Sequence, residues 1–198
     1  PASVAKVIAK ALVDHPRAVI TDVASVKGSI FRELEQLGSS GWERIVGGHP
    51  MAGREVSGAM GAQGNLFLDR PWVIASSDRT SPEAIATVKN LVELLGAFPV
   101  FRTIEEHDCA VALISHTPQV VASVLAGELM DAESSYIELA GQGIRDTIRI
   151  AGSDSNLWTE ILSENSKYIS QQVTSVANHL LEFASALDDG NRESVKAK

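Results

Sequence analysis

The fold is indicated first by residues 18–28, which read AVITDVASVKG. Residues 18–23 form a short apolar and β-branched run that is typical of a buried strand. The polar turn that follows ends at a glycine, and residues 29–37 then show helical spacing. Upstream, residues 1–12 show the same helical spacing. A strand flanked by helices on both sides is typical of a parallel α/β sheet.

The same alternation continues along the first half of the chain. Three further apolar runs, at residues 42–46, 72–75 and 99–104, are predicted strands. Before the last of them, Pro82 stands at the first position of a predicted helix that stops at Gly96. We therefore predict a mostly parallel sheet covered by helices.

The second half of the chain reads as helical throughout. Residues 105–130 have the pattern of a helix interrupted near Pro118, and residues 155–187 that of one long helix with an apolar stripe. We therefore predict two domains, an α/β domain over residues 1–104 and an all-α domain over residues 105–198.

The composition excludes several classes of function. The 198 residues include 25 acidic and 17 basic side chains, a formal net charge of −8. That balance argues against nucleic acid or an anionic membrane as a partner. The single cysteine, Cys109, rules out an internal disulfide and a multi-cysteine metal site. No apolar run is expected to reach membrane-spanning length, and we expect a cytoplasmic protein without a metal centre.

Two polar segments follow predicted strands and are candidates for one site. Asp22, Ser25 and Lys27 come directly after the strand at residues 18–23, and His49 follows the next strand within the sequence GGHPMAG. Ligands bind at the carboxyl ends of strands in open α/β sheets, and a neutral imidazole is suited to accepting a proton. A capped turn and a solvated loop histidine remain the alternatives.

The helical half carries a candidate anion clamp. Arg145 and Arg149 are four residues apart and share a helix face, with Asp146 between them. The planar guanidinium matches a carboxylate, although a surface salt-bridge cluster has the same spacing. Residues 105–108, which read EEHD, invite comparison with a metal site. We interpret them as an acidic helix start, because adjacent residues on a helix point in different directions.

Four ordered segments together resemble the prephenate dehydrogenase family. They are TDVASVKG (residues 21–28), GGHPMAG (47–53), SHTPQ (115–119) and GQGIRDTIRIAGSDSNLW (141–158). The resemblance implies a partial Rossmann-like domain followed by a helical domain that forms a homodimer. It also implies oxidative decarboxylation of prephenate to 4-hydroxyphenylpyruvate, with hydride transfer to NAD or NADP, in tyrosine biosynthesis.

The resemblance also implies roles for individual residues. His49 matches the histidine that accepts the proton of the ring hydroxyl, and Ser25 the serine that hydrogen-bonds the same hydroxyl. Arg149 matches the arginine that clamps the ring carboxylate. Ser115 and Gln119 match positions along the substrate side chain. Further residues implied at the site are Asp146, Trp158 and, as a cofactor contact together with Ser25, Lys27.

The sequence departs from the family pattern at two places. Many relatives have a second histidine where this chain has Gln119. The glycine-rich GxGxxG loop is also missing, since the nearest spacing, at Gly58, Gly61 and Gly64, does not follow a strand. We expect the chain to be a truncated form that binds the dinucleotide weakly and has little activity alone.

Three alternatives stay open at the level of the sequence. The first is an arogenate dehydrogenase, which Arg54 disfavours because it could repel the ammonium group of arogenate. The second is a helical dimerisation or regulatory module without catalysis. The third is a hydroxyacid dehydrogenase, but Lys167 and Asn165 lack the helical spacing that such enzymes use.

Overall fold

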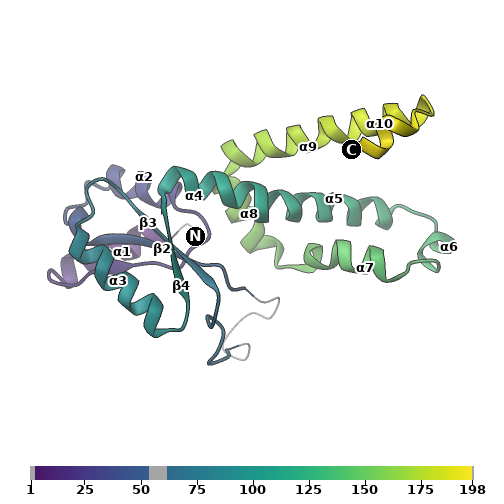
Figure 1. Ribbon diagram of the computed structural model, residues 1–198. Helices are drawn as coiled ribbons and strands as arrows, with labels where there is room; N and C mark the ends of the chain where they lie inside the picture. The colour runs from purple at the N-terminus through teal and green to yellow at the C-terminus, as the bar shows by residue number, and fades with distance from the viewer. Residues whose placement is uncertain (1–2, 54–61, 198) are drawn as a thin grey trace. The chain divides into compact units, whose positions relative to one another are not determined.

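The computed structural model describes residues 3–53 and 62–197 (Figure 1). By packing, the chain divides into two compact units, of which the first comprises Pro1–Val111 and Ser153–Asn165. The second comprises Ala112–Gly152 and Ser166–Lys198. The boundary at residue 104 stays a prediction, and the return of residues 153–165 to the first unit is a feature that the sequence reading does not contain.

The first unit contains a four-stranded sheet in the order β1-β2-β3-β4 (Figure 1). Two pairings, β1 with β2 and β3 with β4, are parallel. β2 and β3 are antiparallel, so the sheet is mostly parallel, as the sequence predicts. Antiparallel neighbours need no crossover helix, whereas parallel β3 and β4 are joined by α3. The strands are Ile20–Thr21 (β1), Ile45–Pro50 (β2), Pro71–Ser76 (β3) and Phe98–Thr103 (β4).

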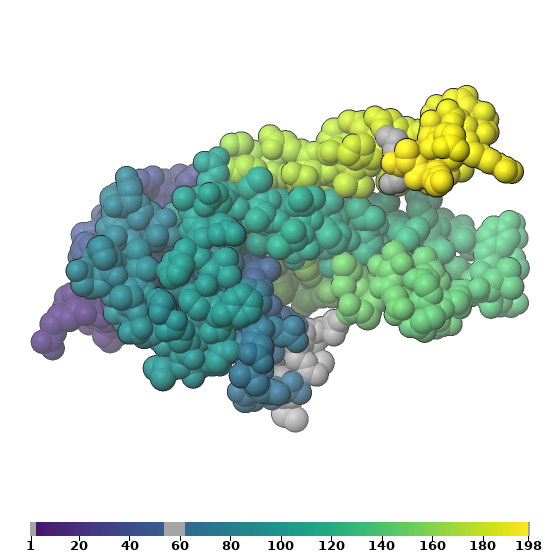
Figure 2. All heavy atoms as spheres, in the orientation of Figure 1, coloured from purple at the N-terminus to yellow at the C-terminus, as the bar shows by residue number. Residues whose placement is uncertain are grey.

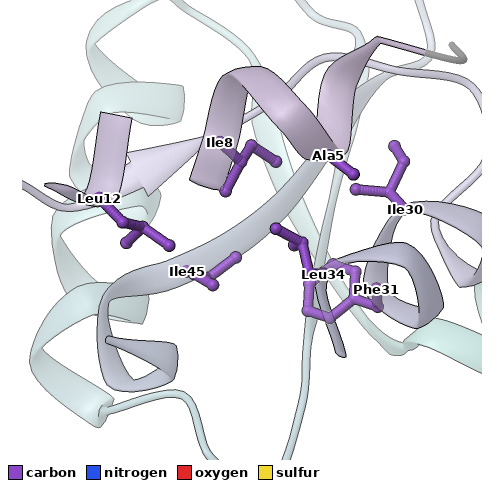
Figure 3. Packing of buried hydrophobic residues seen from close by; sticks show 7 residues of the cluster. All are labelled: Ala5, Ile8, Leu12, Ile30, Phe31, Leu34 and Ile45. Carbon is purple, nitrogen blue, oxygen red and sulfur yellow. The ribbon is translucent and has the colours of Figure 1, made fainter. Parts of the chain in front are cut away.

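Two helices, α1 (Val4–Asp14) and α2 (Gly28–Gln36), build the first core cluster with β2. Their apolar residues recur every three or four positions, so each helix buries one face. Figure 3 shows these side chains turned toward one another. The cluster consists of Ala5, Ile8, Leu12, Ile30, Phe31, Leu34 and Ile45.

The helix α3 (Pro82–Leu94) packs on the sheet through a second cluster. The Ser81 side chain accepts a hydrogen bond from the Ala84 amide, and Pro82 occupies the first turn. This confirms the predicted helix start. Ala84, Val88 and Val92 are buried together with Trp72 and Ile74 of β3.

The helical interruption predicted near Pro118 lies just before that residue. α4 (Ile104–Val111) runs into a π-helical segment, η3 (Ala112–His116), and α5 (Thr117–Met130) follows. Pro118 lies in the first turn of α5. The run Ile104–Met130 stays helical, and the π-helical segment directly before Pro118 is its interruption.

In the second unit, α5 packs against α7, η4 and α9. These helices belong to one predominantly helical body, as the sequence predicts. The remaining elements of this unit are α6 (Ser134–Ile137), α7 (Gln142–Ile148), η4 (Arg149–Gly152), α9 (Ser166–Asp188) and α10 (Arg192–Ala197).

The single helix predicted over residues 155–187 is wrong, because the chain forms α8 (Ser155–Glu164) and α9. The break lies at Asn165, which has φ −110° and ψ 20° and is 3% exposed. Its side-chain amide donates a 2.8 Å hydrogen bond to the carbonyl oxygen of Asp108. A buried tertiary hydrogen bond thus ends a helix whose apolar spacing continues. Asp154 caps α8 by accepting from two backbone amides.

The two glycines before His49 serve close packing between strands. At Gly47, a Cβ would lie 2.9 Å from the Ala75 carbonyl oxygen. At Gly48, it would overlap the Asp22 carbonyl oxygen and come within 3.0 Å of Trp72 Nε1. Both glycines therefore allow close approach of neighbouring backbone.

We expect Gly48→Ala to lower the free energy of unfolding by about 1–3 kcal/mol, because backbone on the next strand cannot move aside. Urea unfolding monitored by circular dichroism measures this loss. Gly53→Ala is the matched control, since a Cβ there meets nothing within 4 Å. Equal stability of the two variants would contradict the packing role.

Candidate functional site

The imidazole of His49 is hydrogen-bonded to a second, buried imidazole. His49 lies in β2, and its Nδ1 is 2.8 Å from Nε2 of His107 in α4. The two rings meet edge to face, with centroids 5.1 Å apart and planes at 72°. His107 is 1% exposed. This contact joins the predicted proton acceptor to a residue that the sequence reading did not place in the site.

The His107 ring is in turn hydrogen-bonded to the carboxylate of Asp108. The His107 Nδ1 lies 2.8 Å from Asp108 Oδ1. Backbone amides of Lys27 and Gly28, at the start of α2, donate to Oδ1 and Oδ2 at 2.9 and 2.8 Å. An anion at a helix N-terminus is favoured by the unpaired amides there. His49, His107 and Asp108 therefore form one continuous chain, called the His–His–Asp chain below.

The Asp108 carboxylate is ionised in this setting. Burial acts to raise its pKa, but the hydrogen bonds from His107 and from the amides of Lys27 and Gly28 outweigh burial and lower the pKa below 3.8. The glycine at position 28 is required for this arrangement, because a Cβ would lie 2.7 Å from Asp108 Oδ2.

Lys27 is a buried partner of Asp22. Its side chain is fully buried, and its ammonium group is paired with Asp22 Oδ1. Asp22 also accepts from the amides of Ala24 and Gly48, which ties the end of β1 to β2. Desolvation lowers the pKa of Lys27 despite the opposing effect of Asp22. The Lys27 charge is thus enclosed and paired within the first unit, and its role as a cofactor contact stays a prediction.

Ser25 lies in the loop between β1 and α2. It lines a cavity of about 560 Å³, together with Thr21, Asp22 and apolar residues of α1. The parallel pairing of β1 with β2 brings the segments of Ser25 and His49 to the same edge of the sheet, as predicted. The role of Ser25 beside the substrate hydroxyl stays a prediction.

The predicted residues of the second unit lie on three of its elements. Ser115 is in η3, and Gln119 in α5 is 4% exposed and donates from Nε2 to the Ile150 carbonyl at 3.0 Å. Arg149 begins η4. Asp146 accepts a 2.8 Å hydrogen bond from Gln142 Nε2, and its role at the substrate site stays a prediction.

Trp158 lies in α8, within the first unit rather than in the helical one. Arg54, Gly58 and Gly61, on which parts of the sequence reading depend, fall outside the described residues. The predicted roles of Trp158, Ser115, Gln119 and Arg149 toward a substrate remain predictions.

The sequence reading missed His107 and Asp108, although a signal for them exists. Ile104, His107, Asp108 and Val111 follow the i, i+3, i+4, i+7 spacing of a buried helix face. Two polar residues on such a face must find partners inside the protein. Adjacent residues on a helix generally point in different directions. The Asp108 carboxylate nevertheless reaches the ring of the preceding residue, His107.

The described residues provide some, but not all, of the groups that would bind a nicotinamide dinucleotide. The cavity beside Ser25 offers hydroxyl groups, but its lining carries no lysine or arginine for a pyrophosphate. Over the described ranges 3–53 and 62–197, no group of three or more His, Cys, Asp or Glu residues is placed to hold a metal ion.

Comparison with family models covers almost the whole chain. Residues 1–101 match the model described as prephenate dehydrogenase, nucleotide-binding domain. Residues 103–197 match the model described as prephenate dehydrogenase, dimerization domain.

Curated relatives include a protein of Streptomyces niveus named probable prephenate dehydrogenase, 34% identical over 96% of this chain and 54% of the relative. The prephenate dehydrogenase of Bacillus subtilis is 35% identical over 74% of this chain and 40% of its own length. The chain thus spans about half the length of the curated relatives it matches.

Solved structures show the same architecture. The arogenate dehydrogenase of Synechocystis is 31% identical with a TM-score of 0.83, covering 100% of this chain and 72% of that one. The prephenate dehydrogenase of Aquifex aeolicus, in complex with hydroxyphenyl propionate and NAD+, is 28% identical with a TM-score of 0.87. That match covers 99% of this chain and 69% of the other. On the family models and on the Streptomyces relative, the chain belongs to the prephenate dehydrogenase family.

Proposed function

We propose that the protein carrying this chain is a prephenate dehydrogenase, which converts prephenate to 4-hydroxyphenylpyruvate and carbon dioxide with hydride transfer to NAD or NADP. The observation that carries the proposal is the His–His–Asp chain at the ligand-binding edge of the sheet, in a member of this family. A histidine held this way is a suitable proton acceptor for a ring hydroxyl.

The chemistry assigned to this chain is the movement of one proton. The nicotinamide, when bound, supplies the hydride acceptor. His49 takes the proton of the ring hydroxyl as the hydride leaves the same carbon, so that a ring carbonyl forms. Cleavage of the ring carboxylate bond then sends its electron pair into the ring, releases carbon dioxide and leaves a phenolate. The protonated His49 can return its proton to that oxygen.

Arg149 is the proposed clamp for the ring carboxylate, with Ser115, Gln119 and Trp158 along the substrate. We expect Arg149→Ala to raise KM by about 10- to 100-fold with a much smaller change in kcat, because a charge-assisted hydrogen bond to the bound carboxylate is lost. Steady-state kinetics on the complete gene product measure both constants. Arg145→Ala is the matched control, since Arg145 donates to the Ala140 carbonyl in its own segment. An unaltered KM for the Arg149 variant would remove the clamp.

Arogenate dehydrogenase is the alternative function, favoured by the match to the Synechocystis enzyme over the full chain. The two substrates differ only in a keto or an amino group on the side chain. Comparing kcat/KM for prephenate and arogenate, each with NAD+ and with NADP+, decides between them. Preference for arogenate would replace the proposed substrate and keep the proposed role of His49.

We also propose that the protein is a homodimer through its helical unit. Figure 2 shows one face of this unit, in teal to yellow. The description of the matching family model supports the proposal, as do large apolar side chains left exposed on the helices. Among the most exposed of them are Met130, Leu181, Ile114, Tyr136 and Leu180.

The apolar surface of the helical run Ile104–Met130 also supports the proposed homodimer. By length and composition alone it is apolar enough to cross a membrane, contrary to the expectation from the sequence, and 33% of its most apolar window is buried. It carries the buried polar residues His107, Asp108 and Gln119, which are typical of a protein core rather than a lipid-facing surface. We infer that a second copy covers its remaining apolar face. Light scattering should give twice the mass of one chain, and a monomer at micromolar concentration would contradict the dimer.

A further inference from the structure

We propose that His107 and Asp108 are positioning residues that fix the tautomer of His49, so that its Nδ1 carries the hydrogen and its Nε2 is the proton-accepting atom. The tautomer follows from the contacts within the first unit alone. Its consequence for catalysis rests on the proposed function.

The derivation starts at the ionised end of the chain. Both carboxylate oxygens of Asp108 accept hydrogen bonds from backbone amides, which cannot reverse their direction. A carboxylate without a proton is an acceptor only, so the contact of 2.8 Å requires His107 Nδ1 to donate. The hydrogen of the neutral His107 ring is therefore on Nδ1.

The second step carries this polarity to His49. A neutral imidazole has one hydrogen, so Nε2 of His107 is an acceptor. Nδ1 of His49 lies 2.8 Å from that atom and must be the donor. The hydrogen of neutral His49 is then on Nδ1, and its Nε2 keeps the lone pair needed to take a proton.

The opposite polarity would require a proton on Asp108. That proton would sit on Oδ1, which already accepts from the amide of Lys27, and a neutral hydroxyl oxygen is a weaker acceptor than a carboxylate oxygen. Burial makes this weakening costly, because no water compensates for it in the interior. When His49 becomes cationic, the same chain points the Asp108 charge toward it and stabilises that state.

The packing around Asp108 is shaped for this role. Gly28 leaves room for its carboxylate at the start of α2, and Asn165 binds its carbonyl oxygen. The aspartate is thus held at both its side chain and its backbone. This fixes the position of its contact with His107 and, through His107, of the contact with His49. Held this firmly, the carboxylate can set the orientation of two rings in succession.

The experiment is a long-range ¹H–¹⁵N correlation spectrum of the 198-residue chain labelled with ¹⁵N-histidine, at a pH well above the ordinary histidine pKa of about 6.5. In the wild type we expect single Nδ1–H tautomers for both His49 and His107. A wild-type His49 with its hydrogen on Nε2 would overturn the proposal.

Two variants test the cause. We expect Asp108→Ala to convert His49 from a single tautomer to a mixture. The second variant, His107→Phe, keeps Asp108 and its hydrogen bonds from the amides at the start of α2, so it serves even if Asp108→Ala does not fold. We expect His107→Phe to give a mixture of the two His49 tautomers as well. His179→Gln, an exposed change in the second unit, is the control and should leave the His49 signals unchanged. A single Nδ1–H tautomer for His49 in both folded variants would overturn the proposal.

Turnover separates this proposal from the proposed function. In the complete gene product we expect His107→Phe to lower kcat by about 10- to 100-fold with little change in KM. If the spectra show the expected tautomers but kcat is unchanged, the positioning is right and the assignment of His49 as proton acceptor is wrong. If the protein turns over prephenate through His49 and the spectra show no tautomer change, only the positioning role fails.

Discussion

His49→Asn is expected to lower kcat for prephenate by roughly 10²- to 10⁴-fold, the range for loss of a positioned general base. Asparagine keeps a polar side chain of similar reach but cannot take a proton near neutral pH. Substrate affinity should change much less, because Arg149 is proposed to carry most of the binding charge. Steady-state assays of reduced nicotinamide formation measure both effects.

The control for this variant is His15→Asn, which changes an exposed histidine between α1 and β1. It should leave kcat and KM at their wild-type values. Thermal unfolding of both variants by circular dichroism shows whether the fold is kept. A wild-type kcat for His49→Asn would exclude His49 as the proton acceptor.

Asp22→Asn is expected to lower the free energy of unfolding by about 3–5 kcal/mol, because it leaves the fully buried ammonium of Lys27 without its counter-charge. Asparagine can still accept a hydrogen bond from a backbone amide, so the loss reports mainly the charge. Urea unfolding followed by circular dichroism measures it. The double variant Asp22→Asn with Lys27→Met should recover much of the loss, since both charges are then absent.

The pH dependence of this variant has a defined sign. Burial lowers the folded-state pKa of Lys27 below 10.5, so the unfolded chain binds more protons between those two pKa values. Stability therefore rises with pH in that window. Removing Asp22 widens the window, and the loss caused by Asp22→Asn should shrink as the pH is raised toward 10.5. Asp14→Asn, in an exposed pair with Lys10, is the control and should shift the unfolding midpoint little. A loss in Asp22→Asn no larger than in this control would contradict the buried ion pair.

Much of the fold of the first unit can be predicted from the sequence because its signals are local. The apolar residues of α1 and α2 recur with helical spacing, and the same residues are buried in the first core cluster. The start of α3 is set locally, by the Ser81 cap to the Ala84 amide and by Pro82 in the first turn. The direction of β3 has no such local signal, because it depends on pairing with a strand distant in sequence.

The break between α8 and α9 shows where local signals fail. Apolar residues continue at helical spacing through Asn165, so the sequence favours one helix. The helix ends because Asn165 is buried and bound to the backbone of Asp108, 57 residues earlier. Long-range hydrogen bonds of this kind leave no periodic pattern in the sequence.

The candidate site divides in the same way. His49 lies between Gly48 and Pro50 at the carboxyl end of β2, and the sequence predicts this end of the strand as its position. Its partners could not, because His107 and Asp108 read as part of an acidic helix start. Their function depends on the start of α2 and on β2 meeting at one place in three dimensions.

We propose that this site couples loss of a hydride from the substrate to loss of the ring carboxylate. The direct measurement is the stoichiometry of the reaction of the complete gene product with prephenate labelled with ¹³C in the ring carboxylate. We predict one ¹³CO₂ and one 4-hydroxyphenylpyruvate for each reduced nicotinamide, all strongly reduced together in His49→Asn. Reduced nicotinamide formed without ¹³CO₂, or no turnover of either prephenate or arogenate, would contradict the account.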